Sequence, residues 1–163
     1  MPEIWDAYDR DFHKIEAVHL VRGEPVPDGL YHLVCDIIVK HADGSFLLMQ
    51  RDFKKHLGGM WELTAGGSAF SGETPQDCAA RELREETGIN ASNLCEIGRI
   101  VHDGHHSLYV EYLCVTDCDK SSVTLQAGET VAYRWVAKSD ILEMGPEELA
   151  SSRTVKLLFE KDL

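Results

Sequence analysis

The sequence predicts an α+β fold in which helices cover the faces of a mixed β-sheet. Two observations lead to this prediction. Strand-like runs come first, a well-delimited helix follows, and further strands and a terminal helix complete the chain, an order typical of a helix-covered mixed sheet. With 163 residues, 44% of them hydrophobic and 27% charged, the chain is long enough for one domain with a sizeable core.

The first part of the chain contains three strand-like runs. Residues 1–29 end in a Pro- and Gly-rich turn and include one run, Ile15 to Val21, so we expect an N-terminal extension packed on a main domain of residues 30–163. Apolar and polar residues alternate from Tyr31 to Lys40, which predicts a strand with one buried face. A turn then leads into a strand from Ser45 to Arg51.

The best-delimited helix is expected from Thr74 to Thr87. Thr74 suits the N-cap, Pro75 the first helical position and Asp77 the third. Gly88 suits the left-handed position that follows the last turn. Both ends of this helix are therefore specified by local sequence.

The remaining elements are three strands and a second helix. The strands are expected at Glu96 to His102, Leu108 to Thr116 and Val131 to Ala137. The second helix is expected to start near Pro146 and to run to about Lys161.

The composition excludes several classes of protein. Sixteen Lys and Arg residues against 28 Asp and Glu residues give a formal net charge of −12, which disfavours nucleic acid and anionic membranes as partners. No window approaches the roughly 18 uninterrupted apolar residues of a membrane span, and the N-terminus lacks the pattern of a signal peptide. Five scattered cysteines without a CxxC pair fit reduced thiols in a cytoplasmic protein.

Three glutamates of the predicted helix point to a metal site. Glu82, Glu85 and Glu86 are spaced i, i+3 and i+4, which places their carboxylates on one helical face. Carboxylate oxygens suit Mg²⁺ or Mn²⁺, and Mg²⁺ leaves coordination positions for water and substrate phosphates. The spacing therefore predicts a site for a metal-diphosphate complex. The alternative is a solvated acidic face stabilised by Arg81 and Arg84.

The residues around these glutamates follow a longer pattern. Five residues separate Gly67 from Glu73, seven separate Glu73 from Arg81, and the next matching residues are Glu82, Leu83, Glu85, Glu86, Gly88 and Ile89. Every position matches the Nudix box, G-x5-E-x7-R-E-U-x-E-E-x-G-U with U apolar, and a chance match is on the order of one in a billion per start site. The chain thus resembles a Nudix hydrolase over the 23 residues of the box.

The resemblance implies the Nudix fold, an α/β/α sandwich, and a role for each box residue. Glu82, Glu85 and Glu86 correspond to the family's metal ligands, and in some members Glu82 or Glu85 serves as the general base instead. The backbone carbonyl of Gly66 corresponds to a further metal ligand. An expected Glu73–Arg81 pair would tie the preceding loop to the helix. The positions with structural roles are Gly67, Glu73, Arg81 and Gly88.

Three residues outside the box are further candidates. Glu129 stands where family members often carry another catalytic carboxylate, with an ordinary loop glutamate as the alternative. Arg51 and Lys55, together with Lys54, form the densest cationic group of an acidic chain. We expect Arg51 and Lys55 to hold diphosphate oxygens, with a plain basic loop as the alternative.

The N-terminal third also resembles the isopentenyl diphosphate isomerase-like branch of the superfamily. The residues that carry this similarity are Trp5 to Asp9, Arg22 to Pro27, Tyr31 to Leu33, Gln50, Arg51 and Lys55. True isomerases carry a cysteine and a metal-binding histidine where this chain has Ala65 and Gly67, and no cysteine is within reach. Isomerisation needs that cysteine as the acid that protonates the alkene. Its absence and the complete set of box carboxylates therefore favour hydrolysis over isomerisation.

The resemblance therefore implies a Mg²⁺- or Mn²⁺-dependent pyrophosphohydrolase, in which water attacks phosphorus of a nucleoside diphosphate linked to another moiety or of a related diphosphate. The expected partners are a small-molecule diphosphate substrate and, from family habit, a second copy in a homodimer. An isomerase-like enzyme and a non-catalytic domain that binds a diphosphate ligand are the alternatives. The intact box favours an enzyme, because we expect a non-catalytic domain to have lost a box glutamate.

Overall fold

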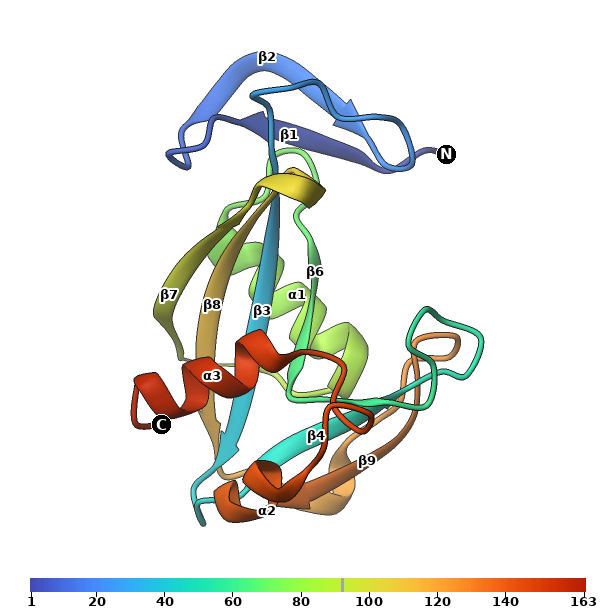
Figure 1. Ribbon diagram of the computed structural model, residues 1–163, viewed down its shortest axis with the longest axis vertical. Helices are drawn as coiled ribbons and strands as arrows, with labels where there is room; N and C mark the ends of the chain where they lie inside the picture. Colours follow the sequence, from blue (N-terminus) through green and yellow to red (C-terminus); the bar gives the residue numbers. More distant parts are fainter. Residues whose placement is uncertain (92) are drawn as a thin grey trace.

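A seven-stranded mixed sheet forms the centre of the molecule (Figure 1). The computed structural model describes residues 1–91 and 93–163. The strands of this sheet are β3 (His32–His41), β4 (Phe46–Arg51), β5 (Trp61–Glu62), β6 (Thr64–Ser68), β7 (Leu94–His102), β8 (Ser107–Thr116) and β9 (Thr130–Val136). β3 pairs parallel with β8 and antiparallel with β4 and β6, while β4 pairs antiparallel with β5 and β9, and β7 with β8.

Helices cover this sheet on both faces. The helices are α1 (Pro75–Thr87), α2 (Lys138–Glu143) and α3 (Ser152–Glu160), with 3-10 turns at Asp103–His105 and Lys120–Ser122. α1 and α3 lie on opposite sides of β3 (Figure 1). No helix in the described ranges is long and apolar enough to cross a membrane.

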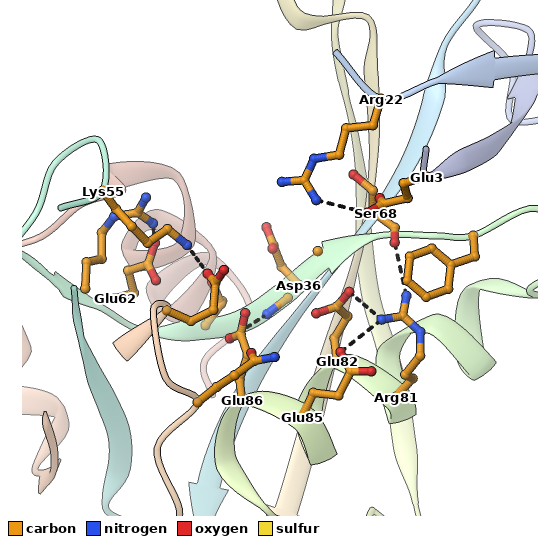
Figure 2. A pocket seen from close by; sticks show the side chains of 17 residues that line it. Glu3, Arg22, Asp36, Lys55, Glu62, Ser68, Arg81, Glu82, Glu85 and Glu86 are labelled. Carbon is orange, nitrogen blue, oxygen red and sulfur yellow. Dashed lines mark hydrogen bonds and ion pairs between the residues drawn. The ribbon is translucent and has the colours of Figure 1, made fainter. Parts of the chain in front are cut away.

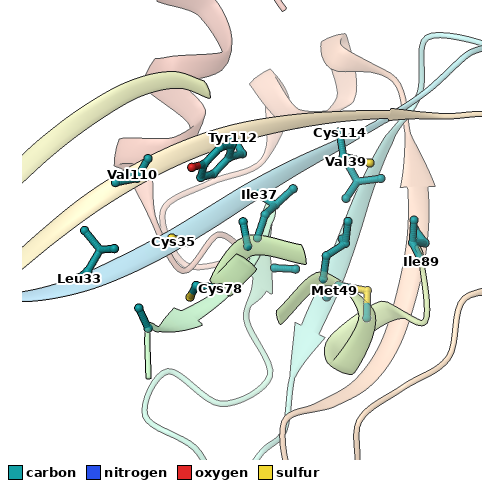
Figure 3. Close-up of a cluster of buried hydrophobic side chains, with 14 of the residues drawn as sticks. Leu33, Cys35, Ile37, Val39, Met49, Cys78, Ile89, Val110, Tyr112 and Cys114 are labelled. Atoms are coloured by element: carbon teal, nitrogen blue, oxygen red, sulfur yellow. The ribbon is translucent and has the colours of Figure 1, made fainter. Parts of the chain in front are cut away.

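Two hydrophobic cores fill the space between the sheet and the helices. Alternate side chains of β3, from Leu33 to Val39, pack with Cys78 of α1 in one core (Figure 3). Leu83 of α1 belongs to the same core. Ile38 points to the opposite face, as strand geometry requires, and belongs to the core that contains Leu158 of α3. The predicted α/β/α sandwich with a mixed sheet is confirmed.

The ends of α1 match the local prediction. The Thr74 side chain accepts a hydrogen bond from the Asp77 backbone N–H at 3.1 Å, and Pro75 is the first helical residue. Gly88 has a φ of 76° and donates its N–H to the Arg84 carbonyl. A Cβ at Gly88 would also lie 2.5 Å from the Thr124 hydroxyl, so this position needs glycine for two reasons.

The six expected strands are all present, and their ends lie within two residues of the predicted ones. Four further elements were not predicted: β1 (Ile4–Tyr8), β5, which has two residues, β6, which contains two glycines, and the short helix α2. The prediction of a second helix from near Pro146 was wrong at its start. Glu148 and Ala150 instead form backbone hydrogen bonds with Trp61 at 2.7 and 2.9 Å, and α3 begins only at Ser152.

The N-terminal extension forms its own two-stranded sheet at one end of the molecule, β1 (Ile4–Tyr8) paired with β2 (Lys14–Val21) (Figure 1). This hairpin is attached to the loop that precedes α1. The buried Asp6 carboxylate accepts hydrogen bonds from the Ser71 hydroxyl and the Gly72 N–H, both at 2.8 Å. The Ser71 N–H donates to the Ile4 carbonyl at 2.9 Å. The hairpin therefore has a defined position beside the box.

A buried ion-pair network joins α3 to the sheet. Asp36 of β3 and Glu111 of β8 are register partners, and both carboxylates pair with Arg153 of α3. The Glu111 side chain is fully buried, and the Arg153 guanidinium stacks over the Tyr109 ring at 4.1 Å. Burial raises the pKa of Asp36, and the Arg153 charge opposes that shift. One arginine thus balances two enclosed carboxylates.

We expect Arg153→Met to lower the free energy of unfolding by about 3–5 kcal/mol, because two buried carboxylates would lose their counter-charge. Denaturant titration measures the loss. Arg99→Met is the control, since Arg99 pairs with Glu96 at the surface and its loss should cost about 1 kcal/mol or less. Equal losses in the two variants would contradict this account of the network.

His32, at the start of β3, is a half-buried histidine whose surroundings disfavour its protonated form. Its ring stacks on Trp5 with a centroid distance of 4.1 Å, and its Nε2 lies 2.8 Å from the Ser107 hydroxyl. Burial lowers the pKa of His32 to about 4, which the negative charge of Glu3 only partly opposes. The folded protein therefore takes up a proton at His32 less readily than the unfolded chain.

This difference predicts that His32 makes the fold less stable as the pH falls. Below the ordinary histidine pKa of about 6.5 the unfolded state binds a proton that the folded state excludes, so stability declines until about pH 4. We expect His32 to account for a loss of about 2 kcal/mol between pH 7 and pH 5. Denaturant titration at both pH values measures the free energy of unfolding. Its decrease from pH 7 to pH 5 should be smaller by that amount in His32→Gln. The control His13→Gln, at an exposed histidine, should show the same decrease as the unsubstituted chain.

Candidate active site

A polar pocket of about 300 Å³ opens where α1 and β6 face the N-terminal hairpin and the loops beside β4 and β9 (Figure 2). Seven carboxylates line it: Glu3, Asp36, Glu62, Glu82, Glu85, Glu86 and Glu129. Four cationic side chains line it as well: Arg22, Arg51, Lys55 and Arg81. Among the described residues that form its wall, Phe70 is the single large apolar one. The pocket is therefore built for a charged, hydrophilic ligand.

The three glutamates of the predicted metal site all reach this pocket from α1. Glu86 is partly buried, and its carboxylate accepts a hydrogen bond from the Gly66 N–H at 3.3 Å. The Glu82 carboxylate packs directly against Gly67. Glu85 is more exposed, with 40% of its side chain accessible. The i, i+3, i+4 spacing thus places the three carboxylates along one wall.

Arg81 organises these carboxylates. Its guanidinium binds Glu73 through Nε and Nη2 at 2.6 and 3.0 Å, so the predicted tie between the loop and the helix is present. The same group donates to Glu82 at 2.8 Å and to Glu85 at 3.2 Å. Burial by itself would lower the pKa of Arg81, but the nearby carboxylates of Glu73 and Glu82 raise it. Its plane also lies 3.8 Å from the centre of the Phe70 ring.

Gly66 and Gly67 leave no room for a side chain. A Cβ at Gly66 would lie 2.2 Å from the Cys35 carbonyl oxygen and 2.5 Å from an Asp36 carboxylate oxygen. A Cβ at Gly67 would lie 2.5 Å from an oxygen of Glu82. These glycines therefore allow the sheet, Asp36 and Glu82 to meet at the floor of the pocket.

The electrostatics of the pocket disfavour so many negative charges. Burial raises the pKa of Glu86 well above its usual value, and the negative charges of Glu82, Glu62 and Glu129 add to that shift. Burial likewise raises the pKa of Glu82 and of Glu62, against the opposing charges of Arg81 and Arg51. A divalent cation among these carboxylates would relieve their repulsion.

The donor set fits Mg²⁺ or Mn²⁺, which prefer carboxylate and carbonyl oxygens. In residues 1–91 and 93–163, no three Asp, Glu, His or Cys side chains lie close enough together to share one ion. Glu82 and Glu85 turn toward Arg81, whereas Glu86 turns toward Gly66. Sharing an ion would therefore require these side chains to rotate toward one another.

The candidates outside the box line the same pocket, and Figure 2 shows Lys55 beside Glu62 at one side of it. Lys55 pairs with Glu129, and Arg51 pairs with Glu62. Arg51 also donates from Nε to the His56 carbonyl at 2.8 Å. The structure thus brings Arg51, Lys55 and Glu129 together with the box glutamates.

Four charged residues of the pocket were not predicted from the sequence: Glu3, Arg22, Asp36 and Glu62. Asp36 carried a usable signal, because a carboxylate within the apolar run of β3 is rarely buried without a purpose. Glu3 and Arg22 carried none, since only the position of the hairpin brings them to the box.

The expectation that no cysteine lies near the Gly-Gly segment needs correction. The thiol of Cys78 is 3.6 Å from the Gly67 carbonyl oxygen, and Cys35 is the strand neighbour of Gly67. Both thiols, however, are fully buried in the core beneath α1, and neither lines the pocket. Among the residues that the structure describes, the pocket wall therefore offers no cysteine as an acid.

Solved structures share this architecture. A protein of Deinococcus radiodurans superposes with a TM-score of 0.76 over 97% of this chain and 98% of its own, at 17% identity. The NUDIX domain of Shewanella oneidensis NrtR, crystallised with ADP ribose, superposes with a TM-score of 0.65 over 82% of this chain and 89% of its own, at 18% identity. At these identities the likeness shows the fold alone.

Curated relatives are more similar in sequence. An uncharacterised Nudix hydrolase of Listeria innocua is 32% identical over 144 residues, covering 85% of this chain and 82% of the relative. The 8-oxo-dGTP diphosphatase of Proteus vulgaris is 37% identical over 72 residues, covering 44% of this chain and 62% of the relative. An isopentenyl-diphosphate Delta-isomerase of Streptomyces avermitilis is 36% identical over 75 residues, covering 45% and 38%.

The sequence model of the NUDIX domain matches residues 30–158, which include the whole main sheet, α1 and most of α3. The hairpin of β1 and β2 lies outside this match. The box and the main sheet lie within the matched residues, and so do all the described residues that line the pocket except Glu3 and Arg22. The chain therefore belongs to the Nudix family, and it is a Nudix hydrolase.

Proposed function

We propose that this chain is a metal-dependent pyrophosphohydrolase that cleaves a nucleoside diphosphate linked to another moiety, or a related small diphosphate. The charge of the pocket carries this proposal. Seven carboxylates face four cations, and three of the carboxylates come from one turn of α1. Such a pocket repels a diphosphate until a divalent cation joins it.

We assign the metal ligands to Glu82, Glu85, Glu86 and the carbonyl of Gly66. A divalent ion in this place would neutralise the substrate's charge and lower the pKa of a water molecule. The raised pKa of Glu86 supports the assignment, because an enclosed carboxylate surrounded by like charges gains most from a bound cation.

The chain's own side chains supply the remaining functions. We assign the proton acceptor for the attacking water to one of Glu82, Glu85 and Glu129, all of which line the pocket. Arg51 and Lys55 are assigned to the diphosphate oxygens. Each now pairs with a pocket carboxylate, so an incoming diphosphate would replace Glu62 and Glu129 as their partners.

Two comparisons support a nucleotide-like substrate. The Proteus vulgaris relative is named for the hydrolysis of 8-oxo-dGTP, and the Shewanella oneidensis domain was crystallised with ADP ribose. Both ligands are hydrophilic phosphoric anhydrides. They match a pocket whose described wall contains one large apolar side chain, Phe70.

An isomerase function has less support. Alanine and glycine have no ionisable side chain, so neither Ala65 nor Gly67 offers the acid that true isomerases carry in this segment. Cys78 lies under Gly67 on the core side. The partial match to one isomerase does not supply these missing groups.

A substrate panel tests the proposal together with one substitution. Purified protein is assayed with Mg²⁺ on nucleoside di- and triphosphates, nucleotide sugars, dinucleoside polyphosphates and isopentenyl diphosphate. We expect Mg²⁺-dependent hydrolysis of at least one nucleotide, none in excess chelator, and no conversion to dimethylallyl diphosphate. Glu86→Gln should lower kcat/KM at least about 100-fold and weaken Mn²⁺ binding measured by calorimetry, because it removes a metal ligand.

Glu160→Gln is the matched control, since Glu160 is an exposed glutamate of α3 far from the box in sequence. Its kinetics and Mn²⁺ binding should equal those of the unsubstituted chain. Two outcomes would contradict the proposal: no turnover of any panel member, or unchanged activity in Glu86→Gln.

A second variant tests the position of one carboxylate. In Gly67→Ala the new Cβ would lie 2.5 Å from the flexible end of Glu82, so the carboxylate moves while the backbone stays. We expect kcat to fall about 10- to 100-fold with little change in Tm. In the control Gly104→Ala, the Cβ meets nothing closer than a His102 ring atom at 3.4 Å. Equal kcat values in the two variants would show that the position of Glu82 is unimportant.

A further inference from the structure

The N-terminal hairpin contributes two charged side chains to the pocket. Glu3, just before β1, and Arg22, just after β2, both line it. In Figure 2 they lie on the opposite side of the pocket from Lys55, with Asp36 and Glu86 between. The pocket therefore extends beyond the box glutamates toward the hairpin.

These two side chains are held in place. The Glu3 carboxylate accepts one hydrogen bond from the Trp5 indole N–H at 2.7 Å and another from Arg22 Nη1 at 3.0 Å. The Arg22 backbone N–H also donates to the Glu3 carbonyl at 3.0 Å. Since Asp6 fixes the hairpin to Ser71, Glu3 and Arg22 keep their position relative to α1.

Arg22 is the most accessible cation of the pocket. Its side chain is 67% exposed, against 31% for Lys55, 17% for Arg51 and 13% for Arg81. Within the described part of the chain, its guanidinium donates one side-chain hydrogen bond, to Glu3. A guanidinium has five N–H donors, so most of those of Arg22 face solvent in the pocket mouth.

We infer that Glu3 and Arg22 form the subsite for the part of the substrate that does not react, which rests on the proposed hydrolase function. Arg22 donates hydrogen bonds to oxygen atoms of this distal group, and Glu3 accepts hydrogen bonds from its hydroxyls. A sugar-like or nucleoside group presents both kinds of atom. An isoprenoid chain presents neither, so it would remove water from both charges without replacing the hydrogen bonds that the water made.

The test compares a whole substrate with a truncated one. The whole substrate is the panel member with the highest kcat/KM, and the truncated probe is methyl diphosphate, measured as a competitive inhibitor. In Arg22→Met and Glu3→Gln we expect KM for the whole substrate to rise about tenfold, with kcat changed less than about threefold. The inhibition constant of methyl diphosphate should stay within about twofold, because this probe lacks the distal group.

Arg10→Met is the matched control, because Arg10 is also an exposed arginine of the N-terminal hairpin and pairs with Asp103 away from the pocket. Its KM should not change. Arg22→Lys should recover part of the loss, which a purely structural role in the hairpin would not require.

The outcomes separate the two proposals. Turnover with an unchanged KM in both Arg22→Met and Glu3→Gln would overturn the subsite and leave the hydrolase intact. An equal weakening of methyl diphosphate would overturn it as well, since the pair would then act on the diphosphate. Absence of any turnover by the unsubstituted chain would instead contradict the hydrolase function itself.

Discussion

The interaction on which the site depends is the set of hydrogen bonds made by Arg81. One guanidinium joins Glu73 in the loop, Glu82 and Glu85 on its own helix, and the Ser68 carbonyl of β6. These bonds fix α1 to β6 and also hold apart carboxylates that would otherwise repel one another. A lysine has the charge but not the planar array of donors, so it could not bind all four acceptors.

A second constraint comes from charges inside the sheet. Asp36 and Glu111 are paired residues of parallel strands, and enclosing both would cost several kcal/mol without Arg153. The position of α3 is therefore set by an ion-pair network as well as by the apolar side chains of Leu157 and Leu158. Because Asp36 also lines the pocket, this network connects the C-terminal helix to the candidate active site.

Features of the fold and the site that depend on neighbouring residues in the sequence were predicted, whereas features that depend on tertiary packing were missed. The ends of α1 were predictable because Thr74 and Gly88 act on adjacent backbone groups. The box glutamates were predictable because helical spacing alone places them on one face. The helix expected near Pro146 failed because pairing with Trp61 holds residues 148–150 at the sheet edge. Arg22 was missed because no spacing reveals which loop a hairpin will lie against.

The contrast between the predictable box residues and the unpredicted Arg22 also bears on how the enzyme selects a substrate. Every diphosphate presents the same reacting group, so contacts to that group bind all of them alike and give no discrimination. In the proposed function, the box glutamates, Arg51 and Lys55 make contacts of this kind. Discrimination requires contacts with the distal group, and a net charge of −12 leaves few cations to make them. Among the described residues that line the pocket, Arg22 is the one cation outside the matched domain, residues 30–158, so the proposed subsite would let substrate choice differ between relatives that keep the same box.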